Sequence, residues 1–297
     1  MTDLLAVATP DTRVDDFRPG RRHHRSAGSW LVLLLVAITA LIIAAPLILV
    51  TINAFKSADQ YLEAGPLSLP SPPTLSNITT YIAQVDFGQK LLNSIIVSTA
   101  VALGASFLSL LSAYAIGVGR IRGRAGITAL FLLVIIIPQE SLIYPLFSGV
   151  QYLGPVQSTV LPLIAILTAL YAAFGTYLIA SVLGEFPRAL LDAAEIDGAG
   201  RWRTLWSVVF PVVRPTVSVL FVMFFIWSWN EFLIPFILLS SGDVQTVPIA
   251  LASLQGDRFQ DPSLTAAGAL VSLLPTLVFF LFFQRTLVKG VAAGAIK

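Results

Sequence analysis

Residues 30–51 read WLVLLLVAITALIIAAPLILVT and contain no charged side chain. The uncharged stretch is longer still, because no Asp, Glu, Lys or Arg occurs between Arg25 and Lys56. About 20 apolar residues in a helix cross a bilayer core of about 30 Å. This stretch therefore predicts a membrane-spanning helix. A cleavable signal peptide has a shorter apolar region and a small-residue cleavage site, so we expect a retained anchor.

The composition of the whole chain extends this conclusion. Of the 297 residues, 56% are hydrophobic and 11% are charged, and the mean hydropathy is +0.85. Ordinary soluble domains carry about 25% charged residues, so the chain belongs to the polytopic membrane class. The formal net charge of +2 and the lack of a basic stripe give no reason to expect nucleic acid as a partner.

Cysteine and histidine usage excludes several chemistries. The chain has no Cys, and its two histidines, His23 and His24, lie in the polar N-terminal tail. Disulfides, thiol nucleophiles and Cys-ligated metals are therefore excluded, and no metal site or Ser-His pair built on histidine is expected within the bilayer.

Five further apolar stretches follow the first. We predict an all-α, polytopic membrane protein with six transmembrane helices, at residues 30–51, 91–117, 126–147, 160–183, 215–239 and 264–283. Cytoplasmic loops retain Lys and Arg preferentially. If both termini are cytoplasmic, all of the 18 Lys and Arg residues except Lys56, Lys90 and Arg258 lie on the cytoplasmic side. We therefore expect cytoplasmic N- and C-termini.

The chain outside the spans divides into tails, loops and one long cytoplasmic segment. We expect a cytoplasmic N-terminal tail at 1–29, a permease domain at 30–283 and a cytoplasmic C-terminal tail at 284–297. The permease domain includes a cytoplasmic coupling segment at 185–214. Residues 56–90 and 240–263 are rich in Pro and Gly, and we expect irregular loops there.

The segment at 185–215 reads EFPRALLDAAEIDGAGRWRTLWSVVFPVVRP. Pro187 suits the first turn of a helix, and Gly198 suits the position that ends one. Small residues follow the apolar positions Leu190 and Leu191. A helix with so little bulk at its exposed end can approach another protein's backbone closely, which predicts a docking element between the fourth and fifth spans.

At these residues the chain resembles the membrane subunits of binding-protein-dependent ABC importers. Their cytoplasmic motif has Glu-Ala-Ala, three further residues including an Asp, and then Gly-Ala. The motif falls on Asp192, Ala193, Ala194, Asp197, Gly198 and Ala199, and its later apolar and proline positions fall on Trp206, Val209, Phe210, Pro211 and Pro215. One departure is that Asp192 replaces the usual Glu, which keeps the charge but shortens its reach by one methylene.

Three more stretches narrow the resemblance to the carbohydrate-uptake, maltose-permease-like branch. They are FKSADQYLEAGPLSLPSPPTLSNITTY at 55–81, WNEFLIPFILL at 229–239 and LFFQRTLVKGVAAGAIK at 281–297. The resemblance implies an ATP-driven importer in the plasma membrane of a bacterium or archaeon, which moves a sugar, such as a di- or oligosaccharide, into the cytoplasm. The implied partners are a second related permease subunit, two ATP-binding cassette subunits and an external solute-binding protein.

The resemblance also implies that this chain is a transport subunit and not an enzyme. The sequence has no Gly-x-x-x-x-Gly-Lys-Ser/Thr phosphate loop, so ATP and Mg²⁺ are expected on the partner ATPase subunits and no cofactor on this chain. The segment 192–199 would sit in a cleft of an ATPase and convert its closure into movement of the membrane helices.

Two acidic residues lie within predicted spans. Taken as continuous helices, the third and fifth spans place Glu140 and Glu231 about 21 and 24 Å from their cytoplasmic starts. A charge in the membrane is costly, so each is expected to face the bundle or a wet cavity. Their polar and aromatic neighbours are Gln139, Tyr144, Trp227, Trp229 and Asn230.

Two interpretations of this group stay open. Carboxylate, amide and aromatic groups suit a sugar path, for which the candidates are Glu140, Tyr144, Trp227, Asn230 and Glu231. The alternative is hydrogen bonding between helices of two subunits, with the partner permease holding most of the substrate. Pro138, Pro235 and Pro275 are expected to shape helix kinks.

Two further contacts follow from the resemblance. The loop after the fifth span is expected to reach the binding protein, with Gln255, Gly256 and Asp257 as candidates, although it could be a simple connector. The C-terminal strip is expected to be flexible unless a partner holds it, and its ATPase-contact candidates are Gly290, Gly294 and Lys297; a frayed end is the alternative.

Other functions remain compatible with parts of the sequence. Within importers, glycerol-phosphate or another small solute could replace the sugar. A different class is a passive channel or scaffold that binds a cytoplasmic partner through the same helix. Association with an ATPase, and loss of accumulation without ATP, would separate the two. A lipid-transfer enzyme would need acidic, His or Cys residues clustered at one interface, and the sequence offers none.

Overall fold

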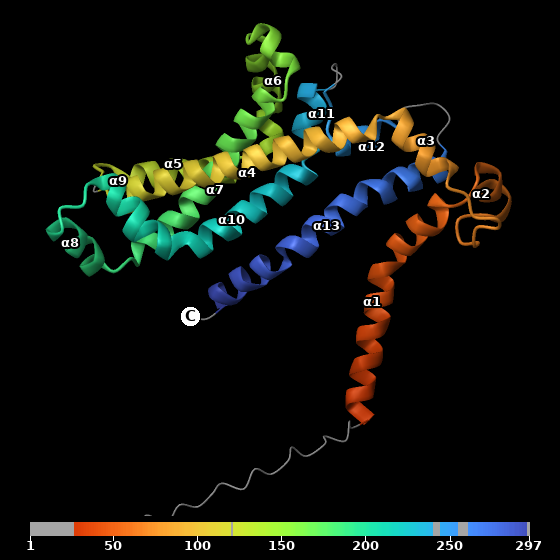
Figure 1. Cartoon of the computed structure of the whole chain (residues 1–297), viewed down its shortest axis with the longest axis horizontal. Helices are drawn as coiled ribbons and strands as arrows, with labels where there is room; N and C mark the ends of the chain where they lie inside the picture. The colour runs from red at the N-terminus through yellow and green to blue at the C-terminus, as the bar shows by residue number, and fades with distance from the viewer. Residues whose placement is uncertain (1–26, 120, 240–243, 255–260, 296–297) are drawn as a thin grey trace, which may run out of the picture. The chain divides into compact units, whose positions relative to one another are not determined.

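The structure is a computed structural model that describes residues 27–119, 121–239, 244–254 and 261–295 (Figure 1). All regular secondary structure in these residues is helical. Five helices are long and apolar enough to cross a membrane, and a bent pair of helices supplies a sixth candidate span. The predicted all-helical membrane fold is therefore confirmed. The chain divides into two units, residues 1–47 and 48–297, and each is described by itself.

The first unit is described only where it forms helix α1. This helix spans Ala27–Ala54, and its last seven residues belong to the second unit. The span within it, Trp30–Ala54, has a mean hydropathy of 3.0. The uncharged Leu, Ile, Val and Ala residues that predicted this helix thus continue in one helix from end to end.

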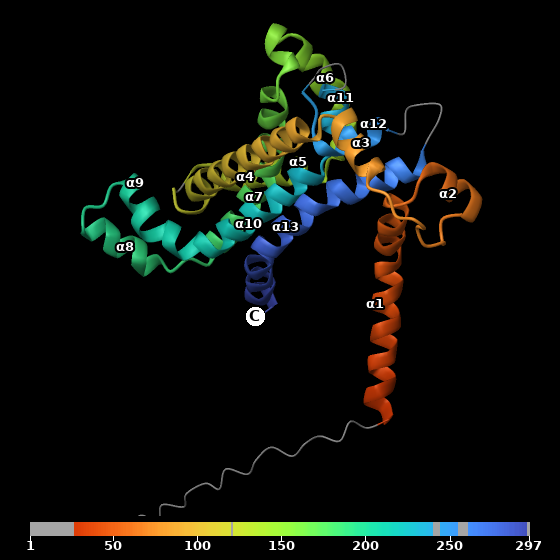
Figure 2. The same cartoon turned by 45° about the vertical axis from the view of Figure 1, so that its right-hand side comes forward.

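Four long helices make up most of the second unit: α4 (Phe87–Gly117), α7 (Leu161–Gly184), α10 (Phe210–Asn230) and α13 (Pro262–Ala295). Helices α4, α7 and α10 pack against one another, and α13 packs against α10 (Figures 1 and 2). The predicted spans at 91–117, 160–183 and 264–283 correspond to α4, α7 and the first two thirds of α13.

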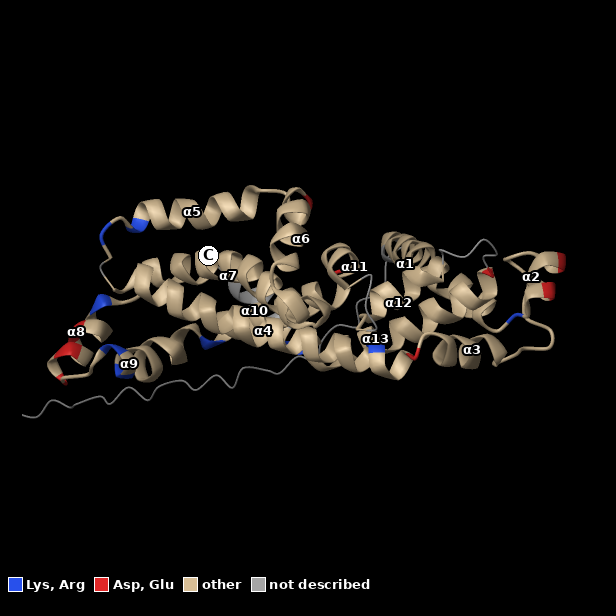
Figure 3. Cartoon of the chain, turned by 90° about the horizontal axis from the view of Figure 1, so that it is seen from above, with Lys and Arg blue, Asp and Glu red and all other residues tan. Residues whose placement is uncertain are grey.

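Charged side chains lie mainly at the ends of this bundle. They gather on α8 (Arg188–Ile196) and α9 (Arg201–Thr204), at the start of α5 (Arg124–Ile136), and on α2 (Ala58–Ala64), while the long helices between are almost entirely uncharged (Figure 3). This distribution is the one that a bilayer core demands, because ionised groups are costly in hydrocarbon.

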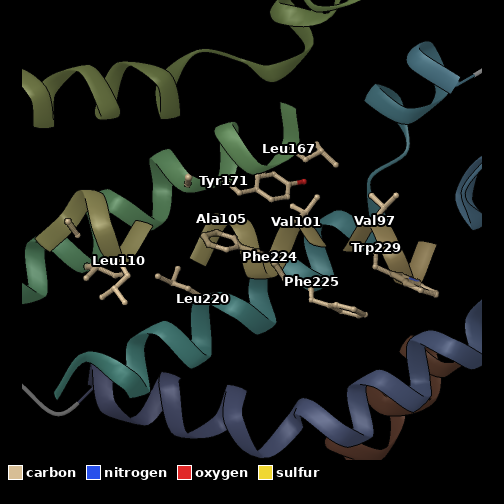
Figure 4. Close-up of a cluster of buried hydrophobic side chains, with 14 of the residues drawn as sticks. Val97, Val101, Ala105, Leu110, Leu167, Tyr171, Leu220, Phe224, Phe225 and Trp229 are labelled. Carbon is tan, nitrogen blue, oxygen red and sulfur yellow. The ribbon is translucent and has the colours of Figure 1, made fainter. Parts of the chain in front are cut away.

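Small residues allow α4 and α7 to pack closely. The hydroxyl of Ser109 on α4 donates to the backbone oxygen of Ala172 on α7 at 3.2 Å. Gly175 lies at the same crossing, where a Cβ would come within 2.9 Å of Phe224 Cζ. A cluster of buried apolar side chains fills the space on either side (Figure 4). It includes Val97, Val101, Ala105, Leu110, Leu167, Tyr171, Leu220 and Phe224.

The third predicted span is broken in the structure. Helix α5 (Arg124–Ile136) ends before Pro138, and a short 3₁₀ turn, η1 (Gln139–Leu142), leads into α6 (Ile143–Gln151). The two halves meet at a bend of 94°. The expectation of one helix at 126–147, and with it the 21 Å depth of Glu140, is therefore wrong. Proline removes a backbone donor, which explains why the helix breaks at this residue.

The fifth span also differs from its prediction. One helical run extends from Arg201 to Asn230 and comprises α9, a π-helical turn η3 (Leu205–Val209) and α10. A break follows, and α11 spans Leu233–Leu239. The helix thus begins 14 residues before the expected start at 215 and does not continue unbroken to 239.

Both stretches expected to be irregular contain helices. Residues 56–90 form α2 and α3 (Ser76–Gln84), and residues 240–263 contain α12 (Val247–Ser253). Ser57 caps α2 by accepting from the backbone N–H of Gln60 at 3.3 Å. Lys56 lies between α1 and α2. Its buried ammonium donates to Asn53 Oδ1 at 2.9 Å and to the Gly65 backbone oxygen at 2.8 Å. Burial lowers the pKa of Lys56.

The C-terminal residues continue α13. The backbone of Gly290 and Gly294 is helical as far as Ala295, which contradicts the expectation of a flexible strip. A second 3₁₀ turn, η2 (Gly154–Ser158), completes the described elements by joining α6 to α7.

Candidate functional site

A cavity of about 370 Å³ lies beside the end of α10. Its walls come from η1, α7 and α10, and they are formed by Gln139, Tyr171, Ile226, Trp227, Asn230 and Glu231. Both helix breaks therefore border it, since Gln139 follows the break after α5 and Glu231 follows α10. This cavity is a wide-open depression in the surface of the helix bundle and not an enclosed chamber.

The structure brings together three of the five predicted path residues. Trp227, Asn230 and Glu231 share this cavity. Glu140 and Tyr144 are outside its walls and exposed, with 79% of the Tyr144 side chain accessible. The bend between α5 and α6 explains why Glu140 and Tyr144 lie apart from the other three residues. The predicted grouping assumes a straight third helix, which the structure lacks.

Aromatic rings form one wall of the cavity. The Tyr171 ring is 5.6 Å from the Trp227 ring at an interplanar angle of 72°, and the Phe174 ring is 5.3 Å from Trp227. Tyr171 also stacks on Phe224 at 5.8 Å. Tyr171 is 4% exposed and Trp227 is 37% exposed, so the buried rings hold the indole at a partly open edge.

The polar wall is built from the end of α10. The Asn230 amide Nδ2 donates to the Ile226 backbone oxygen at 2.8 Å, a bond that does not use the acceptor Oδ1. Glu231 Oε1 accepts from the backbone N–H groups of Leu233 and Ile234 at 3.1 and 3.2 Å. The carboxylate therefore satisfies donors exposed by the helix break, and its other oxygen has no part in that cap.

Sequence reasoning missed Tyr171 and grouped Trp229 with the cavity residues. The Trp229 indole points the other way, is 4% exposed, and donates from Nε1 to Thr276 Oγ1 on α13 at 3.0 Å. Its ring packs 4.8 Å from Phe279. Tyr171 is one of several hydroxylated residues in α7, together with Thr168 and Tyr177, so the sequence contained no signal that singled it out.

The cytoplasmic motif forms a short helix with a defined end. Helix α8 begins after Pro187, and Gly198 adopts a left-handed conformation with φ of 68°. The N–H of Ala199 donates to the Ala194 oxygen at 2.9 Å, and that of Gly198 to the Glu195 oxygen at 3.0 Å. This pairing satisfies carbonyls at the helix end, as in a Schellman-type cap. Gly198 is thus the helix terminator that the sequence predicted.

The motif residues divide between a buried and an exposed side. Ala194 is 6% exposed, whereas Asp192, Ala193, Asp197 and Gly198 are exposed, and Ala199 is partly buried. Apart from the two adjacent residues, no atom of the described part of the chain lies within 4 Å of a Cβ built on Gly198. Most of the motif is therefore accessible to another molecule.

Large apolar side chains beside the motif are also accessible. Ile196 is 87% exposed and Trp202 is 64% exposed. The Trp206 ring, 41% exposed, packs 5.2 Å from Phe210 in the following helix. Exposed apolar residues grouped at a charged end of a membrane protein are typical of a surface that contacts another protein.

The structure does not describe the side chains of the remaining candidates. Four of them lie outside the described residues: Gln255, Gly256, Asp257 and Lys297. Residues 1–26 of the predicted N-terminal tail also lie outside. Gly290 and Gly294 are described only as part of helix α13.

Similar proteins place the chain in a family. Residues 105–291 match the family of binding-protein-dependent transport system inner membrane components. An arabinooligosaccharide transport system permease protein of Halalkalibacterium halodurans is 28% identical, covering 91% of this chain and 96% of that protein. An sn-glycerol-3-phosphate transport system permease protein of Yersinia pestis is 32% identical, covering 86% of this chain and 93% of that protein.

The fold is shared with a solved structure. The crystal structure of a bacterial ABC transporter involved in the import of the acidic polysaccharide alginate contains a chain with a TM-score of 0.72 and 18% sequence identity, covering 90% of this chain and 99% of that chain. The family match includes α7, the cytoplasmic motif, α10 and the cavity residues of both helices. The chain therefore belongs to the family of binding-protein-dependent transport system inner membrane components.

Proposed function

We propose that this chain is one of two permease subunits of an ATP-driven importer that moves a neutral sugar, such as a di- or oligosaccharide, from an external solute-binding protein into the cytoplasm. The observation that carries the proposal is the cavity of about 370 Å³ with Trp227 and Tyr171 on one side and Asn230 and Glu231 on the other. Relatives named as oligosaccharide permeases support the same class of solute.

The cavity chemistry suits a sugar. The C–H faces of a sugar ring pack on aromatic rings, and its hydroxyl groups donate to carboxylate and amide oxygens. Trp227 offers a partly exposed ring, and Asn230 Oδ1 and the second oxygen of Glu231 offer acceptors. Gln139 adds an amide from the facing helix break.

A glycerol-phosphate substrate is the second candidate, because one relative at 32% identity is named as an sn-glycerol-3-phosphate permease. The cavity does not favour it. None of its lining residues is Lys or Arg, and Glu231 contributes a carboxylate. Like charges at about 4 Å repel by about 4 kcal/mol in a protein-like dielectric, so an anion would need cations from a partner subunit.

The orientation follows from the charge distribution. With both termini in the cytoplasm, the basic residues near α5, α8 and α9 lie on the cytoplasmic side (Figure 3). The segment at 185–214 is then cytoplasmic, and α2, α3 and α12 face the outside. This arrangement agrees with retention of Lys and Arg on the cytoplasmic side.

The exposed side of α8 supports a coupling role. We place Asp192, Ala193, Asp197 and Gly198 against a partner ATPase, which binds ATP and Mg²⁺. The open space around Gly198 would let a partner backbone approach closely, and the exposed Ile196 would be covered in the assembly. Closure of the ATPase subunits would then move α9 and α10 through the continuous run from Arg201 to Asn230.

The exposed Glu140 and Tyr144 fit a different part of the assembly. We assign them to the contact with the second permease subunit, because they lie on η1 and α6 outside the cavity. The C-terminal end of α13, with Gly290, Gly294 and Lys297, is proposed to contact the ATPase subunits. Gln255, Gly256 and Asp257 are proposed to contact the solute-binding protein.

Uptake of labelled sugar by the purified complex in vesicles tests the function. Trp227→Ala and Asn230→Ala should lower uptake at least several-fold while the ATPase subunits remain associated. Tyr152→Ala is the matched control, since Tyr152 is 89% exposed and does not line the cavity. Uptake that continues without ATP would identify a passive channel, and competition by glycerol phosphate but not by sugars would identify the second candidate.

A further inference from the structure

Helix α4 is hydrogen-bonded near both ends to segments that are distant in sequence. Near its start, Asn93 Nδ2 donates to the Gln245 backbone oxygen at 3.0 Å, and the backbone N–H of Val247 donates to Ser94 Oγ at 2.9 Å. Near its end, the Tyr114 hydroxyl donates to the Arg201 backbone oxygen at 3.0 Å. We call residues 244–254, which include α12, the outer segment.

The hydrogen bond from Val247 to Ser94 is buried, and the one from Asn93 to Gln245 is partly buried and oriented by a third residue. Asn93 is 7% exposed and Ser94 is 2% exposed. Gln89 Nε2 donates to Asn93 Oδ1 at 2.9 Å, so the Asn93 amide is left to donate toward Gln245. Buried hydrogen bonds are costly to leave unmade, because the freed donor or acceptor finds no water. The outer segment is therefore held to α4 at a defined position.

Apolar packing holds the same segment from the other side. Val247, Ile249 and Ala250 are between 0% and 3% exposed. Val247 belongs to a buried cluster with Tyr81 on α3 and Val271 on α13. Figures 1 and 2 show α3 and α12 together at the end of the bundle where α4 begins. The outer segment is thus fixed to three helices and is not a loose connector.

Between its two ends, α4 is packed along the core. Ser94 and Tyr114 are 20 residues apart, a distance of about 30 Å along a helix. Val97, Val101 and Ala105 between them pack in the core with α7 and α10 (Figure 4). Close-packed interiors transmit displacement because they have few voids to absorb it. A shift of the outer segment would therefore reach the helix end that contacts Arg201, two residues after the cytoplasmic motif.

We propose that α4 transmits the docking of the solute-binding protein to the ATPase-facing motif, with Asn93, Ser94 and Tyr114 as positioning residues at its two ends. The inference rests on the proposed function, because it requires a binding protein outside and an ATPase inside. It assigns to the Asn93 and Ser94 hydrogen bonds a role in communication and not only in folding.

The experiment measures stimulation of ATP hydrolysis by the sugar-loaded binding protein, using the complete complex in vesicles. Ser94→Ala and Tyr114→Phe should each lower the stimulation by about fivefold or more, the lower limit of a typical coupling between sites. Ser94→Thr keeps the hydroxyl and should restore it. The double variant should lose little more than either single variant, because both changes interrupt one connection.

Two control variants match these changes. Ser98→Ala removes a buried hydroxyl one turn further along α4 that has no hydrogen-bond partner among the described residues. Tyr152→Phe removes a phenol hydroxyl from an exposed ring. Both should keep the stimulation of the parental complex. Thermal stability of each variant is measured in parallel, and Ser94→Ala should lose stimulation at a temperature where it is fully folded.

Each outcome decides the inference. Parental stimulation in Ser94→Ala or Tyr114→Phe overturns it while leaving the proposed function intact. Equal loss in Ser98→Ala, or losses that multiply in the double variant, also overturns it, because the effect is then general or the two ends act separately. If the parental complex shows no stimulation by any sugar-loaded binding protein, the proposed function itself fails and the inference fails with it.

Discussion

Replacing Gly175 by alanine should force α7 away from its two neighbouring helices. A Cβ at this position would lie 2.9 Å from Ser109 Cβ on α4 and 2.9 Å from Phe224 Cζ on α10. Carbon atoms in contact prefer about 3.5–4.0 Å, so each contact overlaps by about 0.6–1.1 Å. The Ser109 atom is fixed to its backbone and cannot rotate away. The helices must therefore separate, and the rings around Tyr171, one turn earlier on α7, shift with them.

The cost can be worked from these contacts. Overpacking a core by one methyl group costs about 1–3 kcal/mol, and loss of the hydrogen bond from Ser109 to Ala172 adds about 0.6 kcal/mol in a membrane protein. The better helix propensity of alanine offsets about 1 kcal/mol of this cost. The remaining loss of about 0.6–2.6 kcal/mol lowers Tm by about 1–10 °C for a domain of this size. We expect this decrease for Gly175→Ala.

The purified chain is heated in detergent, and the fraction that stays monodisperse is measured at each temperature. The temperature at which half remains gives Tm. Gly184→Ala on the same helix is the control, because no described atom outside the local helix backbone and the adjacent residues lies within 4 Å of a Cβ built there. Alanine is also a better helix former than glycine by about 1 kcal/mol, so the control should be as stable as the parent or more so. If Gly175→Ala and Gly184→Ala have the same Tm, the close crossing of α4 and α7 does not limit the size of residue 175.

Three further predictions concern the motif and the cavity. Gly198→Leu should insert into the membrane normally and abolish uptake. Gly123→Leu is the control, because residue 123 has the same left-handed backbone (φ 81°) outside the motif, and it should retain uptake. Equal loss in both variants would assign the effect to backbone strain. Asp192→Ala should lower the amount of ATPase that co-purifies with the chain, and unchanged association would exclude a contact of its carboxylate. Glu231→Ala should lower Tm, because two backbone N–H groups lose their acceptor and the free energy of unfolding falls by about 1–3 kcal/mol. Glu231→Gln keeps an acceptor and should have a Tm close to that of the parent. Equal stability of the two variants would contradict the capping role.

Four of the six predicted spans could be placed from apolar length alone. Residues 91–117 and 160–183 agree within a few residues with α4 and α7 because each stretch is bounded by charged or helix-breaking residues. The break at Pro138 could not be placed in this way. Pro138 marks its position, as the expected kink at this proline indicates, but apolar length contains no information about a bend of 94°.

Proline also misled the interpretation of the outer segment. Pro248 contributes to the Pro and Gly content for which we expect an irregular loop at 240–263, but it occupies the first turn of α12, where a missing N–H costs nothing. The start of the fifth helical run was missed for a different reason. Arg201, Arg203 and Arg214 were assigned to a segment between spans, although a helix that extends beyond the bilayer tolerates such residues.

The cavity was only partly predictable because it depends on contacts between elements. The neighbouring positions Trp227, Asn230 and Glu231 were identified because they interrupt an apolar stretch with polar groups. Tyr171 contributes from another helix, 56 residues earlier than Trp227, and a single sequence contains no measure of that proximity. Glu140 was included through an assumed straight helix that the structure lacks.

The break after α5 has a consequence for how the protein enters the membrane during synthesis. Helix α5 has 13 residues and measures about 20 Å, which is shorter than a hydrocarbon core of about 30 Å. It cannot partition into lipid as an independent span, and its exposed backbone ends require neighbouring protein. Its main packing partner, α7, ends at Gly184. Stable integration of this region must therefore wait until the ribosome has translated past that residue, so the third and fourth segments integrate as one unit.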